Sequence, residues 1–462
     1  MNNLEIDNLL QDLNSKPGHL EKIEWWVGKD KIITTRISEY LGKYSTSTIL
    51  PEGATNFLQL CSLLLLEREE EMVDVIRNIC IHNPETTRKF IQSLIESPFY
   101  YHRMAVPRII VDMDAKDILL QCFRDQSGIV IKQAAMSLSQ YKVLPLGEDE
   151  LMGIAMDLNN HQYDYVQCTV PDILIHLKEK TFLVSEVCLS PSWRKRLAIA
   201  TKISFFDKQN KATIFSLLHK DKEEGIRAAL VGHLTEVDNM REYTEIFIKD
   251  PSEKVRALTV RAIGGLGDSQ YQDILGKACE DPSWLVRKEL LCIHNENIYE
   301  TISLPLITSL PSNHDWRVKV EILESILHLS QKNSALIRRC LSGILFEYLA
   351  DKVFVIREKT SSVIKSLVEN VLTEDWAEEW KDKIRNILES PNYLLRISIA
   401  PVCVPFDRLF NTSFVPVLLQ DKVPNVRLKV LENLEDVAAY KELVEAMEKD
   451  EYIEKEIKRL FS

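Results

Sequence analysis

The chain has little glycine and proline, with 14 Gly and 17 Pro in 462 residues. These residues dominate the tight turns of sheets and the composition of long linkers, so their scarcity leaves little material for either. Hydrophobic residues make up 45% of the chain, which is enough to build a core. The composition therefore predicts a folded and mostly helical protein.

The chain also lacks an excess of positive charge, because 57 basic residues face 69 acidic ones and the net charge is -12. Such a balance repels a phosphate backbone, so we expect no nucleic-acid partner. The first residues lack the basic region and apolar core of a signal peptide, and the longest apolar stretch, around Leu60 to Leu66, is too short to cross a bilayer. We expect no membrane contact and a cytoplasmic location, with the nucleus as an alternative.

Motifs of catalysis are missing as well. Nine cysteines, from Cys61 to Cys403, contain no close C-x-x-C pair, so they are predicted to be reduced thiols in the core and not metal ligands. None of the ten histidines is followed by Glu, which excludes the zinc motif H-E-x-x-H. Gly264-Gly265 with Gly267 fits neither phosphate-loop pattern. We therefore expect a protein that is not an enzyme and that needs no cofactor.

A repeated phrase is present instead. Roughly every thirty residues a turn containing Asp or Ser is followed, six residues on, by a basic residue in the first turn of an apolar helix, as in Asp250 and Arg256. The residues at this position are Arg103, Ile131, Gln167, Arg196, Arg227, Arg256, Arg287, Lys319, Arg357, Arg396 and Arg427, and the two that are not basic, Ile131 and Gln167, break the pattern. Self-similarity at this period is typical of a solenoid, and a single compact core is not expected at this length.

Each repeat is predicted to be an antiparallel pair of helices. In the copy that begins at Asp250-Pro251, the Asp and Pro favour a turn and Ser252 can cap the second helix. The stretch from Tyr243 to Ile248 would form the first helix. Apolar residues at helical spacing predict one buried stripe on the second helix, made of Val255, Leu258, Ala262 and Ile263. Stacking of such pairs would bury the stripes.

Five copies place an Asp six residues before the Arg, and this constant offset predicts a ladder of charged contacts along the array. We expect each Arg to bond an Asp of its own or of a neighbouring repeat. In exposed positions such a pair contributes less than about 1 kcal/mol. The predicted ladder consists of Asp221, Arg227, Asp250, Arg256, Asp281, Arg287, Asp351, Arg357, Asp421 and Arg427.

Several tryptophans lie in turns or first helical turns, where they gain less from a core than a residue in mid-helix. Trp and Arg are types that anchor protein interfaces, so Trp193 and Trp316 are predicted to contact a partner. Trp284 is predicted to pack between repeats instead. Trp376 and Trp380 lie four residues apart on a helix and are also expected to be packing residues.

The array resembles HEAT repeats, which implies one all-α solenoid over residues 1–462, with about fifteen helix-turn-helix units stacked in a horseshoe. Several copies, in order, resemble more closely the scaffold (A) subunit of protein phosphatase 2A. The phrases that carry this resemblance are His314 to Val320, Leu349 to Glu358, Trp376 with Trp380, Ser390 to Arg396, and Asp421 to Arg427. Similar phrases at Ser97 to Arg103 and Ser192 to Arg196 extend it to residues 97–438.

The resemblance implies a non-catalytic scaffold. The repeats of residues 301–462 would hold the phosphatase catalytic subunit, and those of residues 1–238 would hold an exchangeable regulatory subunit of the B type, with no obligatory homo-oligomer. Catalytic-subunit contacts would be Trp316, Arg317, Phe354, Asn392, Tyr393, Val423 and Asn425. Regulatory-subunit contacts would be Tyr100, Lys132, Trp193 and Arg194.

Some features depart from that family and leave an alternative. The repeats are shorter than the usual forty or so residues, and Lys319 stands where Arg is expected. Another binding solenoid, such as a nuclear transport receptor or the regulatory chain of a different phosphatase, would share the acidic charge and the repeats. The ordered set of Trp316, Phe354, Tyr393 and Asn425 favours the phosphatase scaffold over these, because other HEAT arrays have no reason to carry it.

Overall fold

The computed structural model describes residues 31–42, 54–66, 68–82, 84–111, 113–293, 315–330, 335–434, 438–446 and 451–461. These residues form helices joined by short turns, with no strand among them. None of the helices in these ranges is long and apolar enough to cross a membrane. The chain divides into two compact units, residues 1–240 and residues 241–462.

The first unit consists of short helices, most of them two to four turns long. They are α3 (Lys31–Gly42), α4 (Ala54–Leu64), α5 (Glu69–His82), α6 (Pro84–Ile95), α7 (Tyr100–Ile109), α8 (Lys116–Phe123), α9 (Gly128–Ser137), α10 (Glu148–Asn159), α11 (Asp164–Gln167), α12 (Val170–Leu174), α13 (Thr181–Cys188), α14 (Trp193–Ala200), α15 (Lys208–Leu218) and α16 (Glu224–Val231).

The second unit begins within α17 (Met240–Phe247) and contains longer helices toward its end. They are α18 (Glu253–Gly264), α19 (Gln272–Ala278), α20 (Trp284–Leu291), α23 (Trp316–Ser330), α24 (Ala335–Tyr348), α25 (Phe354–Asn370), α26 (Glu374–Leu388), α27 (Tyr393–Phe410), α28 (Phe414–Leu419), α29 (Pro424–Leu431), α30 (Lys441–Ala446) and α31 (Glu451–Phe461).

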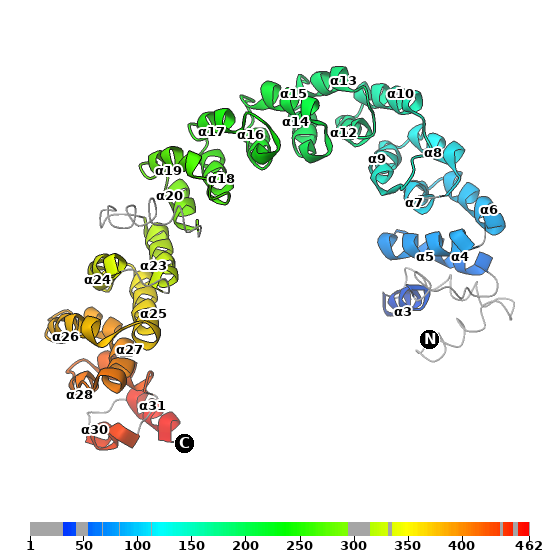
Figure 1. Cartoon of the computed structure of the whole chain (residues 1–462). Coiled ribbons are helices and arrows are strands. Elements are labelled where there is room, and N and C mark those ends of the chain that lie inside the picture. Colours follow the sequence, from blue (N-terminus) through cyan, green and yellow to red (C-terminus); the bar gives the residue numbers. More distant parts are fainter. Residues whose placement is uncertain are drawn as a thin grey trace. The chain divides into compact units, whose positions relative to one another are not determined.

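Within each unit the helices alternate between two layers (Figure 1). In the second unit, α18, α20, α23, α25, α27, α29 and α31 pack side by side in chain order as the second helices of successive repeats. The first helices form the other layer, in which α26 packs on α28 and α28 on α30. The predicted architecture is confirmed, because helix pairs stacked in this way make an α-solenoid.

The buried surface of α18 is wider than the predicted stripe. Val255 and Ile263 are fully buried as expected, but Leu258 and Ala262 are only half-buried, while Val260 is also fully buried. A second helix contacts its own first helix and the second helix of the next repeat, so more than one face is covered. An amphipathic stripe describes a helix packed on one side only.

One repeat departs from the pattern where its ladder position holds Gln167. Its second helix is split into α11, which ends at Gln167, and α12, which carries Pro171 in its first turn. Proline has no backbone N–H and fits only the first turn of a helix, so a new helix begins there. The sequence showed the weak ladder position but not this break.

The aromatic and cysteine packing agrees with the prediction. Trp376 and Trp380 are 7% and 0% exposed, and their ring centroids lie 5.3 Å apart. The eight described cysteines are all free thiols, and five of them are buried. Burial raises the pKa of the Cys80 thiol to about 11, which keeps it protonated and unreactive.

We predict that Trp380→Ala will lower the free energy of unfolding by about 3–5 kcal/mol, because the ring is fully buried against Trp376 and Phe346. Val417→Ala, at a half-exposed position of α28, is the control and should change it by less than about 1 kcal/mol. Denaturant unfolding followed by circular dichroism measures both. Equal effects would contradict the packing of α26.

Candidate protein-binding ridge

The turn inside each repeat is closed by its own aspartate. The Asp250 carboxylate accepts a hydrogen bond from the Ser252 backbone N–H at 2.8 Å, and the Asp421 carboxylate accepts one from the Val423 N–H at 2.8 Å. Ser252 itself makes no side-chain cap, contrary to our expectation. The aspartate side chain forms this contact instead, because in an Asx turn it accepts a hydrogen bond from the backbone N–H two residues further along.

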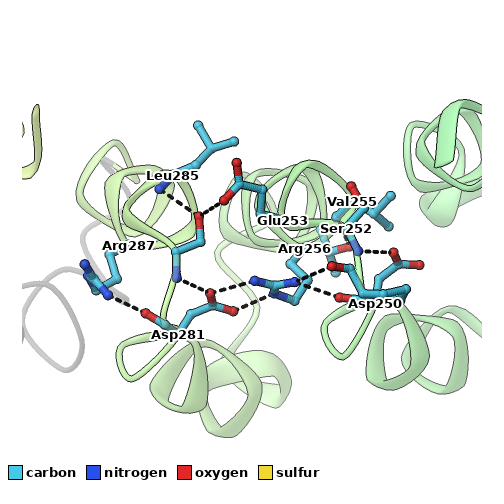
Figure 2. A network of polar contacts seen from close by, with 11 residues as sticks. Asp250, Ser252, Glu253, Val255, Arg256, Asp281, Leu285 and Arg287 are labelled. Atoms are coloured by element: carbon cyan, nitrogen blue, oxygen red, sulfur yellow. Dashed lines mark hydrogen bonds and ion pairs between the residues drawn. The ribbon is translucent and has the colours of Figure 1, made fainter.

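The ladder arginine joins this turn to the next repeat, as Figure 2 shows for Arg256. Its Nη1 donates to the Asp250 carbonyl of its own turn at 2.7 Å. Its Nε and Nη2 donate to the two carboxylate oxygens of Asp281, in the next repeat, at 2.7 and 2.9 Å. One planar guanidinium therefore fixes two adjacent repeats by a bidentate contact.

Four more contacts of this kind link adjacent repeats. They are Arg103 with Asp125, Arg196 with Asp221, Lys319 with Asp351, and Arg396 with Asp421, with closest N–O distances of 2.5 to 2.7 Å. In these four pairs every side chain is 10% exposed or less, so the pairs are buried and not exposed as we had assumed.

The six-residue offset has a different cause from the one predicted. It places the basic side chain on the backbone carbonyl of its own turn, whereas the charge pairs with the aspartate of the next repeat. The carbonyl contact is made by all five predicted arginines: Arg227 to Asp221, Arg256 to Asp250, Arg287 to Asp281, Arg357 to Asp351 and Arg427 to Asp421. Where Ser replaces the Asp, the carbonyl still accepts, as from Arg196 to Ser190.

The ladder carboxylates of Asp221 and Asp421 have lowered pKa values. Burial raises the pKa of Asp221. Hydrogen bonds from Arg196 and from the Glu223 N–H together have a larger, opposite effect, so the pKa of this carboxyl lies below the ordinary value of 3.8. Burial also raises the pKa of Asp421, but the hydrogen bond from Arg396 is the main contact that lowers it, and the pKa again lies below that value. Both carboxylates are therefore ionised whenever the repeats are stacked near neutral pH.

The residue three positions before each ladder residue is the first residue of the second helix. We call the row of these residues, together with the residues directly beside them, the ridge. Six of these first helix residues are aromatic: Tyr100, Trp193, Trp284, Trp316, Phe354 and Tyr393. All but Trp284 are 43–62% exposed, which is unusual for large apolar side chains.

The seven residues predicted to contact a catalytic subunit all lie on the ridge of the second unit. Trp316 and Arg317 open α23, Phe354 opens α25, Asn392 and Tyr393 flank the start of α27, and Val423 and Asn425 flank the start of α29. Six of them are exposed and Val423 is half-buried. The structure thus places them at equivalent positions of four successive repeats.

The four residues predicted to contact a regulatory subunit lie in the first unit. Tyr100 opens α7, and Trp193 and Arg194 open α14. Lys132 is exposed on α9, beyond its first turn. The Arg194 guanidinium lies 5.0 Å from the Trp193 ring centroid and contacts Asp164 at 3.5 Å.

Trp284 belongs to the ridge although sequence reasoning assigned it to packing. The Arg317 guanidinium lies 4.6 Å from the Trp284 ring centroid and 5.1 Å from that of Trp316. A cation between two rings is attracted to both π faces, which holds the two tryptophans of adjacent repeats around one charge. Trp284 therefore packs against the next repeat and at the same time shapes the surface beside Trp316.

Sequence reasoning missed a second aromatic pair, in the first unit. Tyr163 and Tyr165 flank the start of α11, are 43% and 41% exposed, and stack at 5.4 Å. The signal was present, since both lie directly beside Asp164, the position equivalent to Trp193. It was obscured because Gln167 replaces the ladder arginine of that repeat.

Comparison with known proteins supports the fold. The family model for HEAT repeats matches residues 240–291. A solved structure of a Kap121p mutant aligns with a TM-score of 0.50 at 14% identity, over 93% of this chain and 56% of that one. A structure of Kap95p with RanGDP aligns with a TM-score of 0.49 at 14% identity, over 96% and 63%. No curated protein matches the sequence.

The chain is therefore an α-solenoid in which residues 240–291 match HEAT repeats and whose fold is similar to that of Kap121p. The chain spans little more than half the length of the Kap121p structure that it matches. At this identity the likeness extends to the fold and not to the partners. The more specific resemblance to the phosphatase scaffold remains a prediction.

We predict that Arg256→Ala will lower the free energy of unfolding by about 3 kcal/mol, because it leaves the buried Asp281 carboxylate without its cation. Arg385→Ala removes an exposed pair with Asp382 and should cost less than about 1 kcal/mol. Denaturant unfolding of both variants measures the difference. If the two variants lose the same amount, the ladder does not hold the repeats together.

Acid should also weaken the array. Because the folded pKa of Asp221 and Asp421 lies below 3.8, their stabilisation is complete well above that pH and is lost as pH falls through the folded values. Asp421→Asn should lower the melting temperature near neutral pH, and this temperature should then decrease less steeply in acid than that of the wild type. Asp382→Asn, at an exposed pair, is the control and should keep the wild-type slope. An unchanged acid slope in Asp421→Asn would contradict this assignment.

Proposed function

We propose that this chain is a non-catalytic HEAT-repeat adaptor that holds a protein partner on the ridge of its second unit. The observation that carries the proposal is the row of exposed aromatic residues at Trp316, Phe354 and Tyr393. Exposed apolar side chains that lie together on a surface mark sites of protein–protein interaction. Tryptophan, tyrosine and arginine are also the residues that contribute most to binding at interfaces.

The chemistry of the polar clusters supports a binding role over a catalytic one. Ser204, His233 and Glu236 come together like a catalytic triad, with Ser204 Oγ at 3.2 Å and Glu236 Oε1 at 2.8 Å from a histidine nitrogen. Both contact the same atom, Nδ1, so the imidazole cannot pass a proton from one to the other. Burial raises the pKa of Glu236, but bonds from Lys211, His233 and Ser204 lower it to about 2, as in a structural ion pair.

The first candidate partner is a phosphatase catalytic subunit. What supports it is the resemblance to the phosphatase 2A scaffold, whose implied contact residues coincide with the exposed ridge. On this proposal the ridge of the first unit, with Tyr100, Trp193 and Arg194, binds an exchangeable regulatory subunit. Holding both on one frame raises their effective concentration toward each other, so the second binding event becomes intramolecular.

The second candidate is a nuclear transport receptor, and the fold comparison favours it over the first. The solved structures with the same fold are karyopherins such as Kap121p, and Kap95p is solved with RanGDP. A net charge of -12 also suits the recognition of basic segments. This candidate would use Ran and cargo as partners in place of phosphatase subunits.

One binding experiment separates the candidates. We predict that the purified chain binds a phosphatase 2A catalytic subunit and that the double variant Trp316→Ala with Arg317→Ala weakens this binding about thirtyfold, because two ridge anchors are lost. The matched control is Trp193→Ala with Arg194→Ala, which removes the same dipeptide from the start of α14 in the first unit. It should leave catalytic-subunit binding unchanged and weaken regulatory-subunit binding.

Calorimetric titration with the catalytic subunit, and in parallel with GTP-bound Ran, measures these affinities. Binding of Ran in place of the phosphatase would assign the chain to the second candidate. Equal binding of the phosphatase by wild type and by the Trp316 and Arg317 double variant would remove the ridge from the interface.

A further inference from the structure

Among the described residues, the ladder has no charge pair between repeats at Arg287 or at Arg357, and Arg357 lies in the middle of the second-unit ridge. Arg357 donates through Nη1 to the carbonyls of Asp351 and Lys352, at 2.7 and 3.1 Å, as the other ladder arginines do in their own turns. Its Nε and Nη2 have no carboxylate partner among the described residues. The next repeat places Ser390 where the other repeats place the aspartate.

Ser390 is equivalent to Asp421 of the following repeat. Each lies six residues before a ladder arginine and accepts that arginine through its carbonyl, Ser390 from Arg396 and Asp421 from Arg427. Each side chain also accepts the backbone N–H two residues on, at 3.2 Å for Ser390 and 2.8 Å for Asp421. The turn is therefore the same, and only the negative charge is missing.

In another pair of adjacent repeats both members of the charge pair are replaced by neutral residues, so no unpaired cation remains. Ser190 also replaces the aspartate, and the preceding repeat carries Gln167 at its ladder position. The Gln167 side chain still donates to the carbonyl of its own turn, at His161. A neutral side chain is thus sufficient to close the turn. Arg357 keeps its positive charge although its own turn does not require one.

The surroundings of Arg357 point toward an external anion. Its guanidinium lies 5.7 Å from the ring centroid of Phe354, which is 62% exposed, and the next ridge residue is the exposed Tyr393. Lys352 in the same turn is exposed and positively charged. The Arg357 side chain is half-buried, so an ion pair formed there would be less screened than one on an open surface.

We propose that the protein bound on the second-unit ridge inserts an aspartate or glutamate side chain between Arg357 and Ser390 and so completes the ladder. The inference rests on the proposed function and adds the chemistry of one contact to it. The partner's carboxylate would accept from Nε and Nη2, as Asp421 accepts from Arg396. The adaptor would then recognise an acidic residue at a fixed distance from the Phe354 and Tyr393 rings.

The test is to supply the missing charge from within the chain. Ser390→Asp keeps an acceptor for the Asn392 N–H and puts a carboxylate in front of Arg357. It should raise the melting temperature of the free protein and weaken binding of a phosphatase 2A catalytic subunit about tenfold, because the internal carboxylate occupies the guanidinium and repels the partner's acid.

Two matched variants control this result. Ser390→Asn has the size of the aspartate without its charge, and should change neither property. Ser190→Asp adds the same charge opposite the neutral Gln167 and should not affect catalytic-subunit binding. Titration calorimetry and thermal unfolding measure all four proteins.

Each outcome decides between the proposals. If wild type binds the catalytic subunit and Ser390→Asp binds it equally well, the carboxylate contact is wrong and the adaptor function stands. If wild type does not bind it, the phosphatase candidate and the carboxylate contact fall together, and the titration with Ran decides on the adaptor function. If inorganic phosphate raises the melting temperature of wild type but not of Ser390→Asp, while partner affinity is the same in both, the position binds a free anion and the inference is overturned.

Discussion

The contact on which the rest of this structure depends is a guanidinium shared between two repeats. One nitrogen of Arg256 closes the turn of its own repeat, and the other two hold the carboxylate of Asp281 in the next. The pair is buried, so taking its charges out of water is unfavourable unless every lone pair finds a donor. The backbone N–H of Ser283 supplies one more bond to Asp281, which helps to offset that cost. A planar, bidentate contact fixes both the distance and the rotation between neighbouring repeats.

The ridge follows from the same geometry. The first residue of the second helix lies three positions before the ladder residue. This offset is nearly one helical turn, so both residues lie on the same side of the helix. The ladder side chain points into the stack, and the ridge side chain at the helix start lies at its edge. Where that residue is Glu253, its carboxylate accepts from Ser283 of the next repeat and serves the stack itself. Where it is aromatic, as at Phe354, no such bond forms and the ring stays exposed.

Sequence reasoning identified the helix pairs and the ridge residues because both depend on local patterns. Asp-Pro turns, the basic residue six positions later and aromatic residues at helix starts all act within one repeat. The ladder was only half understood, since its constant offset reflects a backbone carbonyl that carries no signature of its own in the sequence. Trp284 packs against the next repeat as predicted, but its neighbour in space, Arg317, lies 33 residues further along the chain and could not be named from the sequence. The tyrosine pair at 163 and 165 was missed because its repeat lacks the arginine that marked the others.

The sequence by itself determined that this chain is a helical solenoid and which side chains stand at the start of each second helix. Periodicity and turn chemistry are local, and they act on residues a few positions apart. Only the tertiary structure decided which ladder positions hold a charge pair, how deeply the pairs are buried, and that Nε and Nη2 of Arg357 have no carboxylate partner among the described residues. The reason is that ladder partners belong to different repeats and lie from 22 to 32 residues apart. Burial and pairing therefore depend on how whole repeats stack, which no short segment of the chain specifies.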